Sequence, residues 1–521
     1  MMIYRFIITI FLIPVFCFAQ NQYLDTSFNG TGKFFLGTVF NYPNSNSEYI
    51  TDAVEQPDGK VIFLGISHSN SGFFEPIYCT VFRLNTDGTL DDSFGNEGVF
   101  QYSTYQHQRN LFNVASKIVL QNDGSLLIAG VGYAVANNLN SDLIVMKLNA
   151  NGSIDTFFGE NGISRLPILI GNNLKINDMI VYNDVIYTAG RANSYAYIAS
   201  INLDGSINTN FNGLGTLILD DTSLYYNDIK KLKIVSGKLL AIGISKDSSF
   251  NIRLSLARVF LDGSLDISYG TSGIATPALI GETNESILDY QLLPDDKLLT
   301  IIGGNFYQVN KYGLLDATFG TNGFIKNPYN ESFLTATITA DKKTILSKSI
   351  IDGPADIYQS FKTVRINSDF TKDAGYYNNG QVLTNVLAPE HYVQAPAKVL
   401  ALSNGKTLVA GTVTTIPNPN VSSIKQQKYV VVRYTTAGTL QTQDTDKREF
   451  LTYPNPVKNT INFKTLEKVK KAEIYDLSGR LIKAESKIEN NKIDASALKY
   501  GDYILKITTD KQVYHSKFIK E

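Results

Sequence analysis

The sequence predicts an all-β protein: a seven-bladed β-propeller closed by its own N-terminal strand, followed by a small C-terminal β-sandwich. Three observations support this prediction. A turn phrase recurs at an interval that suits one four-stranded blade, a β-hairpin signal lies between successive copies, and the repeat region begins and ends with the two halves of one copy. Variable loops between four short strands are typical of propeller repeats of this length.

The turn phrase is complete in LNTDGTLDDSFGNEG at Leu84–Gly98, and a diverged copy without the D-G turn spans Ile366–Gly380. In a third copy Asn208 replaces the usual aspartate. Each copy carries an aromatic residue four positions before its final glycine, and we expect that residue to pack between blades. The final glycines lie 50 to 66 residues apart, at Gly32, Gly98, Gly162, Gly215, Gly273, Gly323 and Gly380.

Hairpin signals lie between these copies, as in AVEQPDGKVIFLG at Ala53–Gly65 and VLALSNGKTLVAG at Val399–Gly411. Two β-rich runs flank a D-G or N-G pair, because such turns need positive φ at low steric cost. A further apolar run follows each hairpin and supplies a third strand, and the turn phrase leads to a short fourth strand. Seven hairpins of this kind predict seven blades.

The two ends of the repeat region predict how the ring closes. The first copy starts in the middle of the phrase, at LDTSFNGTGKFFL, and the last copy at Tyr434–Gln443 lacks its second half. We therefore expect Leu24–Leu36 to supply the outer strand of the last blade and to pair with residues 429–441. Closure of this kind removes exposed sheet edges, which otherwise promote aggregation.

The LDxSFGxxG phrase resembles the delta-60 repeat of uncharacterised bacterial surface and secreted proteins. The resemblance covers about residues 24–441. It implies a propeller and no particular chemistry. Because one copy carries Asn208 and another lacks the D-G turn, a function that needs every copy intact is not expected.

The N-terminus has the features of a secretory signal peptide over residues 1–19. Arg5 provides the positive charge, Phe6–Phe18 is an apolar stretch too short to span a bilayer comfortably, and Ala19 precedes the expected cleavage site before Gln20. Lipidation of Cys17 is disfavoured because Phe16 stands where that signal needs a small residue. No later apolar run approaches the length of a membrane-spanning helix.

Composition changes near residue 441. A propeller domain over residues 20–441, a polar linker over residues 442–449 and a third domain over residues 450–521 are expected. The last domain holds 14 Lys and Arg against 9 Asp and Glu, whereas the whole chain has a net charge of −1. A local reversal of charge balance of this kind indicates a separate module, and its short alternating strands predict a β-sandwich.

This C-terminal module resembles the type A sorting domain of the type IX secretion system. The resemblance rests on three segments and a Lys-rich last strand, with the matching residues Tyr453, Pro454, Asn455, Pro456, Asp476, Gly479, Arg480, Gly501 and Tyr503. It implies export through the periplasm and across the outer membrane by the type IX machinery. It also implies removal of the domain by a sortase-like peptidase, and either anchoring to surface lipopolysaccharide or release. An adhesive sandwich is the alternative.

The sequence offers no recognisable catalytic or cofactor-binding constellation. The four histidines, His68, His107, His391 and His515, are far apart and have no metal-ligand spacing. Repeated acidic residues are compatible with calcium, but their spacing is shorter than a calcium loop, and turn formation explains them better: Asp87, Asp91, Asp204, Asp262 and Asp266. Cys79 is expected to be a core residue. A net charge near zero gives no general attraction to nucleic acid.

Aromatic residues in irregular loops are the remaining candidates for ligand contacts: Phe73, Phe74, Tyr102, Tyr105, Tyr225 and Tyr226. Exposed rings there would stack on sugar faces, although folding back onto the propeller is the favoured alternative. The sequence thus predicts a secreted or cell-surface propeller that binds an unidentified glycan or protein without catalysis. A glycan-active enzyme that uses two carboxylates, and a structural component of a surface coat, are the alternatives.

Overall fold

The structure is a computed structural model. It describes residues 23–37, 46–69, 77–103, 114–133, 141–168, 173–220, 224–279, 282–351, 359–386, 393–415, 426–436, 452–453, 456–463, 468–476, 480–486, 488, 491–510 and 513–521. The expected signal peptide with Ala19 and Gln20, and the expected linker, lie outside the described residues. The chain divides into two compact units, Met1–Leu440 and Gln441–Glu521.

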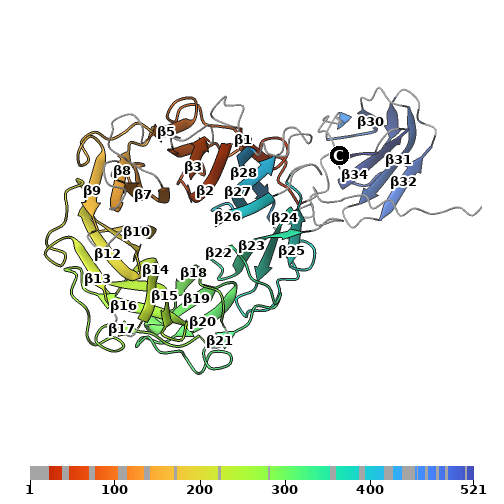
Figure 1. Cartoon of the computed structure of the whole chain (residues 1–521). Coiled ribbons are helices and arrows are strands. Elements are labelled where there is room, and N and C mark those ends of the chain that lie inside the picture. The colour runs from red at the N-terminus through yellow and green to blue at the C-terminus, as the bar shows by residue number, and fades with distance from the viewer. Residues whose placement is uncertain are drawn as a thin grey trace, which may run out of the picture. The chain divides into compact units, whose positions relative to one another are not determined.

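The first unit is a ring of seven antiparallel four-stranded sheets (Figure 1). Blade 1 contains β2 (Asn46–Glu55), β3 (Val61–Ser69), β4 (Ile77–Leu84) and β5 (Val99–Ser103), and blade 2 contains β6 (Val114–Leu120), β7 (Leu126–Tyr133), β8 (Ser141–Leu148) and β9 (Ile163–Pro167). Blade 3 contains β10 (Leu174–Tyr182), β11 (Val185–Ala192), β12 (Tyr195–Asn202) and β13 (Thr216–Leu219), and blade 4 contains β14 (Leu224–Val235), β15 (Lys238–Asp247), β16 (Ile252–Val259) and β17 (Ile274–Ala275).

Blade 5 contains β18 (Ile287–Leu292), β19 (Leu298–Ile302), β20 (Asn305–Val309) and β21 (Phe324–Ile325), with a single 3₁₀ turn, η3 (Pro294–Asp296), between its first two strands. Blade 6 contains β22 (Thr335–Ile338), β23 (Thr344–Ile351), β24 (Gln359–Ile366) and β25 (Gln381–Thr384). Blade 7 contains β26 (Val393–Ala401), β27 (Thr407–Thr415), β28 (Gln426–Tyr434) and β1 (Lys33–Leu36). The predicted fold class and the seven blades are confirmed.

The N-terminal strand closes the ring. β1 pairs antiparallel with β28, with Lys33 opposite Val432 and Leu36 opposite Tyr429, and an isolated bridge joins Leu24 to Tyr434. Figure 1 shows β1 beside β28 although these strands lie at opposite ends of the propeller sequence. The predicted pairing of Leu24–Leu36 with the last repeat strand is therefore confirmed for the described residues.

The motif aromatic of each turn phrase fills the space between neighbouring blades. Phe28 is buried in a cluster with residues of β3, β4 and β28. The glycine of the D-G turn in blade 1 lies against it: a Cβ added to Gly88, whose φ is +83°, would stand 2.5 Å from the Phe28 ring. In blade 2, Gly152 approaches Phe94 in the same way. The positive φ and this close approach both require glycine.

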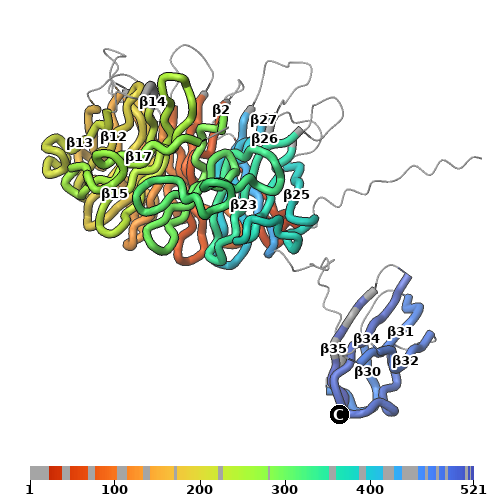
Figure 2. The backbone as a smooth tube through the Cα atoms, turned by 90° about the horizontal axis from the view of Figure 1, so that it is seen from below, coloured from red at the N-terminus to blue at the C-terminus, as the bar shows by residue number. Residues whose placement is uncertain are grey.

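The second unit is a β-sandwich, as predicted, and Figure 2 labels most of its strands. A three-stranded sheet contains β29 (Thr452–Tyr453), β30 (Thr460–Phe463) and β33 (Lys492–Asp494), and a four-stranded sheet contains β32 (Leu481–Glu485), β31 (Val469–Asp476), β34 (Gly501–Thr509) and β35 (Val513–Lys520). Apolar side chains of both sheets, including Ile461, Ile474, Leu505 and Phe518, form its core. In neither unit do the described residues form a helix long and apolar enough to cross a membrane.

Candidate functional site: a ring of charges around the propeller axis

The innermost strand of most blades contains a β-bulge. The register shifts in β2, β6, β10, β14, β18 and β26, and in each case an ionisable residue follows the shift. This residue lies three or four positions before the end of its strand. In β22, for which no register shift occurs, Thr335 occupies the equivalent position. A bulge bends the strand and redirects a side chain. We call these seven residues the axial ring: Asp52, Lys117, Asp178, Lys231, Asp289, Thr335 and Lys398.

The signs of charge in the axial ring alternate from blade to blade. Aspartate occupies blades 1, 3 and 5, lysine occupies blades 2, 4 and 7, and the neutral Thr335 stands between Asp289 and Lys398. Strict alternation is impossible in a ring with an odd number of members, since one pair of like charges would always be neighbours. Thr335 removes that repulsive pair and leaves three charges of each sign.

Close ion pairs occur on one side of the ring only. Lys117 Nζ lies 2.9 Å from an Asp52 oxygen and 3.5 Å from an Asp178 oxygen, and Lys398 Nζ lies 2.7 Å from the other Asp52 oxygen. In the described part of the chain, no carboxylate oxygen lies within 4.0 Å of Lys231 Nζ. Lys231 is therefore the ring lysine without a close counter-charge.

Oxygen atoms of the ring also bind the backbone of the following blade. The carboxylates of Asp52, Asp178 and Asp289 accept hydrogen bonds from the backbone N–H groups of Ile118, Leu232 and Ile338, at 3.3, 2.9 and 2.9 Å. Thr335 Oγ1 takes this role in blade 6 and accepts from the Val399 N–H at 3.3 Å. These hydrogen bonds thus join the innermost strands of neighbouring blades, which no hairpin connects.

The environment moves the pKa values of the ring in opposite directions. Burial alone would raise the pKa of Asp52, but the ammonium groups of Lys398 and Lys117 outweigh it and hold that pKa well below its usual range. Burial lowers the pKa of Lys231, the charges of Lys117 and Lys398 add to this effect, and Asp178 and Asp289 offset it only in part. Burial likewise raises the pKa of Asp289. Charge is least compensated between blades 4 and 5.

The ring borders a cavity of about 400 Å³. Four lysines line it, Lys117, Lys230, Lys231 and Lys398, whereas only two carboxylates do, Asp52 and Asp289. Hydroxyl and amide side chains at the bulges add neutral polar groups: Thr51, Ser116 and Asn177, with Ser286, Thr335 and Thr337 from blades 5 and 6. A cavity of this size suits a small polar molecule or one unit of a polymer.

The repeated aspartates of the turn phrase have a structural role. Asp91 Oδ2 accepts hydrogen bonds from Arg83 Nε at 2.7 Å and Lys60 Nζ at 2.8 Å, and its other oxygen accepts from the Ser93 hydroxyl. Burial opposes ionisation of Asp91, but these donors outweigh it and hold its pKa well below the usual range. Corresponding pairs join Asp25 to Arg433, Asp266 to Arg258 and Asp373 to Arg365.

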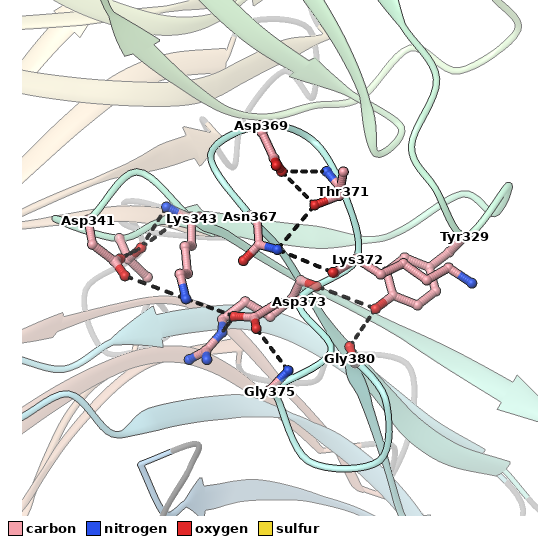
Figure 3. A network of polar contacts seen from close by, with 12 residues as sticks. Tyr329, Asp341, Lys343, Asn367, Asp369, Thr371, Lys372, Asp373, Gly375 and Gly380 are labelled. Carbon is pink, nitrogen blue, oxygen red and sulfur yellow. Dashed lines mark hydrogen bonds and ion pairs between the residues drawn. The ribbon is translucent and has the colours of Figure 1, made fainter.

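Figure 3 shows this arrangement in blade 6, where Asp373 contacts Lys343 and the Gly375 N–H. In the same view Asp369 receives hydrogen bonds from the backbone and hydroxyl of Thr371, as turn-forming aspartates do. Asp87, Asp204 and Asp262 make the same local bonds with the residue two positions on. Within the described residues, no group of three His, Cys, Asp or Glu side chains is arranged to hold a metal ion.

The structure describes few of the loop aromatics predicted from sequence. Tyr102 lies opposite Cys79 in the β4–β5 pair and packs half-buried against the core between blades 1 and 2. The side chains of Tyr225 and Tyr226, at the start of β14, lie outside the described residues, as do Phe73, Phe74 and Tyr105. Cys79 is buried, and burial raises its pKa far above the usual range, so its thiol is unreactive.

Several sorting-domain residues have defined positions. Tyr503 is buried in β34, stacks on Phe518 with ring centroids 5.6 Å apart, and donates its hydroxyl proton to the Lys499 carbonyl. Arg480 Nε lies 3.1 Å from an Asp476 oxygen, and Gly501 begins β34 with φ +148°. Tyr453 is in β29 and Pro456 is exposed, whereas Pro454, Asn455 and Gly479 lie outside the described residues.

Sequence reasoning missed the axial ring. The charge at this position differs in sign from one repeat to the next, so the position does not form a sequence motif. The bulge that turns these side chains toward the axis also requires no particular residue type. A usable signal exists nonetheless. An alignment of the hairpins on their turns places a charged residue four positions before the turn's first residue, as with Asp52 before Gln56 and Lys117 before Gln121.

Comparison with known families identifies both units. Residues 451–521 match the secretion system C-terminal sorting domain, and residues 56–94 and 121–158 match the beta-propeller domain of unknown function DUF5122. A search of curated proteins finds no match to the sequence.

The solved structures that match this chain share little sequence with it. PorZ of Porphyromonas gingivalis, described as an essential surface component of the type IX secretion system, has 11% identity and a TM-score of 0.23, over 91% of this chain and 81% of that one. Prolyl oligopeptidase B of Galerina marginata has 11% identity and a TM-score of 0.36, over 71% and 47%. The GH93 α-L-arabinofuranosidase of Fusarium graminearum has 11% identity and a TM-score of 0.33, over 77% and 98%.

The two family matches agree with the fold of the units in which they lie. The DUF5122 segments run from the hairpin turn to the motif aromatic in blades 1 and 2, and the sorting-domain match covers the sandwich. The chain therefore carries DUF5122 β-propeller repeats and a type IX C-terminal sorting domain, and it is a protein secreted to the cell surface or the exterior.

Proposed function

We propose that the propeller is a non-enzymatic binding module that takes a polar group of a glycan or protein into its axial cavity. The observation that carries the proposal is the cavity itself, about 400 Å³ in volume and lined by lysine, aspartate, hydroxyl and amide side chains from different blades. Propeller repeats supply the rigid frame, and the sorting domain delivers this frame to the outside of the cell.

The export route belongs to the same proposal. After signal-peptide cleavage before Gln20, the chain passes through the periplasm and the type IX machinery carries it across the outer membrane. A sortase-like peptidase then removes the sorting domain, and the propeller is anchored to lipopolysaccharide or released. The sorting-domain match supports this route.

Binding is tested with the full exported chain on a panel of glycans and outer-membrane proteins, followed by Ser116→Trp, which blocks the cavity at the blade 2 bulge. The control is Ser248→Trp, because Ser248 is exposed in the turn after β15 and does not line the cavity. A ligand whose affinity falls at least tenfold in Ser116→Trp and stays unchanged in Ser248→Trp supports the proposal. Equal binding by both variants contradicts it.

A glycan-cleaving enzyme is the second candidate, favoured by one specific observation. Asp52 and Asp289 line the same cavity, and their pKa values move in opposite directions, as in a base and an acid that act together. Against this role, two lysine ammonium groups already contact Asp52. Turnover of any polysaccharide that Asp289→Asn abolishes would replace the binding proposal. A structural coat component predicts neither binding nor turnover.

A further inference from the structure

The lysines that border the axial cavity differ in how their charge is balanced. Lys117 and Lys398 contact Asp52, and Lys230 Nζ lies 2.7 Å from the buried Asp228. Lys231 has no such partner among the described residues. Three of the four cavity lysines are thus neutralised by protein carboxylates, and one is not.

The two aspartates that flank Lys231 in the ring are already engaged. Asp178 accepts from the Leu232 N–H at 2.9 Å and lies 3.5 Å from Lys117 Nζ. Asp289 accepts from the N–H groups of Tyr290 and Ile338, both at 2.9 Å. Backbone donors hold these carboxylates in place, and neither has an oxygen within 4.0 Å of Lys231 Nζ. A partly buried ammonium without a counter-ion gains most from an added anion.

Neutral polar groups surround this position. Asn177 and Ser116 stand at the bulges of blades 3 and 2, and Ser286 and Thr337 lie on the side of blades 5 and 6. The side-chain hydroxyls among them can donate to and accept from ligand hydroxyls, and the Asn177 amide oxygen can accept. A ligand that satisfies both features carries one negative group and several hydroxyls, as a sugar acid does.

We propose that the axial cavity binds a small hydroxylated anion, of the sugar-acid class, with its negative group on Lys231. The inference rests on the proposed binding function and specifies the ligand of the same cavity. The negative group accepts from the Lys231 ammonium, while the hydroxyls of Ser116 and Thr337 bind the ligand hydroxyls. Asn177 Nδ2 already donates to Asp228 and to the Ile229 carbonyl, so this residue contributes its amide oxygen as an acceptor. Lys231 is the specificity-determining residue, because it distinguishes an acidic sugar from its neutral counterpart.

The test titrates the full exported chain with D-glucuronate, with neutral D-glucose and with inorganic sulfate, using calorimetry. Wild type is expected to bind glucuronate more tightly than sulfate and to bind glucose at least tenfold more weakly than glucuronate. Lys231→Met is expected to lose about tenfold or more in glucuronate affinity, the usual effect of removing a charge-assisted hydrogen bond. Lys231→Arg keeps most of it.

Lys233→Met is the matched control, since Lys233 is an exposed lysine on the same strand, and it should bind like wild type. A second measurement, by NMR, does not depend on a difference in affinity between variants. After ¹³C reductive methylation, the resonance that Lys231→Arg removes should shift on addition of glucuronate. This shift keeps the proposal testable if Lys231→Met does not fold.

The outcomes separate the inference from the function on which it rests. Glucose binding equal to glucuronate binding, both abolished by Ser116→Trp, refutes the anion inference and keeps the binding function. Glucuronate binding that is unchanged in Lys231→Met, with no resonance shift, also refutes the inference. Absence of binding by all three probes overturns the inference, and the function itself is then judged on the wider panel.

Discussion

The guanidinium of Arg433 donates a hydrogen bond to the carboxylate of Asp25 at 2.7 Å, although 408 residues separate them in sequence. Lys406 Nζ contacts the same carboxylate at 2.7 Å, and the Ser27 hydroxyl donates to its other oxygen. Blade 1 contains the same arrangement between Arg83 and Asp91, also at 2.7 Å, but across only 8 residues. The two clusters contain the same types of side chain in the same contacts. They differ only in that the Asp25 cluster joins the two ends of the propeller sequence and the Asp91 cluster does not.

This difference predicts distinct consequences for Asp25→Asn and Asp91→Asn. Each variant leaves a buried guanidinium without its carboxylate, and we expect each to lower the free energy of unfolding by about 3 to 5 kcal/mol. Only Asp25→Asn should release β1, so hydrogen exchange at residues 33–36 should accelerate in this variant alone. Urea unfolding and residue-resolved exchange measure both effects. Equal protection of β1 in the two variants would contradict the closing role of Asp25.

The free energy of unfolding should depend on pH through carboxylates of this kind. Asp25, Asp91, Asp266 and Asp373 have pKa values below their usual range, because hydrogen bonds and basic neighbours outweigh the opposing effect of burial where burial is large. A lowered folded-state pKa stabilises the protein above the unfolded-state value of about 3.9 and loses this effect as pH falls further. Asp289, with its raised pKa, contributes in the opposite sense.

We therefore expect the free energy of unfolding to change little between about pH 7 and pH 5, and to fall steeply below about pH 4. Urea denaturation at a series of pH values measures it. The slope in the acid range should be smaller in Asp91→Asn, which lacks one of these groups. A maximum of stability below pH 4 would show that the repeated aspartates are not the acid-sensitive groups.

The neutral position of the axial ring gives a third prediction. Thr335→Val removes the acceptor of the Val399 N–H and should cost about 1 kcal/mol. Thr335→Asp adds a carboxylate beside Asp289, and Thr335→Lys adds an ammonium beside Lys398. Because either charge creates a like-charged pair, both should be less stable than Thr335→Val, and added salt should reduce the difference. A charged variant as stable as wild type would refute the alternation argument.

Phe250 gives a fourth prediction. It lies between β15 and β16 with φ +63°, a conformation that bulky residues rarely adopt, and 59% of its surface is exposed. Phe250→Asn should raise the free energy of unfolding by about 1 kcal/mol, since asparagine tolerates this region. Phe250→Ala, which removes the ring and keeps the Cβ atom, is the control and should give a smaller gain or none. Thermal unfolding measures both.

Delivery by the C-terminal unit is the fifth prediction. Residues 442–521 fused to an inert exported reporter should carry it across the outer membrane of a host with type IX machinery. A chain truncated after residue 441 should keep its fold, because β1 and not the sandwich closes the ring, and should stay in the periplasm. Cell fractionation measures both. Surface delivery of the truncated chain would restore the adhesive-sandwich interpretation.

Local sequence was sufficient to predict the blades because each turn requires particular residues. Gly59, Gly124 and Gly405 have φ between +79° and +83°, as the hairpin signals demand. Closure was also predictable, since the missing half of the last phrase is present at the other end of the chain. These features depend on contacts between neighbouring residues or on identity with other copies.

The candidate site was not predictable in this way. Asp52 and Lys117 become neighbours only when two blades pack against each other. The number of residues between successive members of the axial ring also varies from blade to blade. The ion-pair partners of the repeated aspartates were easier to predict, because a basic residue recurs just before most turn phrases, as in Arg83 and Arg258. That recurrence was a signal for an ion pair, and it would have explained Asp91 and Asp266 without calcium.

The axial ring also makes the seven blades distinguishable around the propeller axis. Seven blades of one architecture would present the same surroundings to a bound molecule seven times over, and the molecule would have seven equivalent orientations. Because the seven members of the axial ring are not all alike, the ring of side chains has no rotational symmetry: a compact arc of ion pairs centred on Asp52 faces a sparser arc at Lys231 and Asp289. A molecule bound on the axis would therefore have a single preferred orientation.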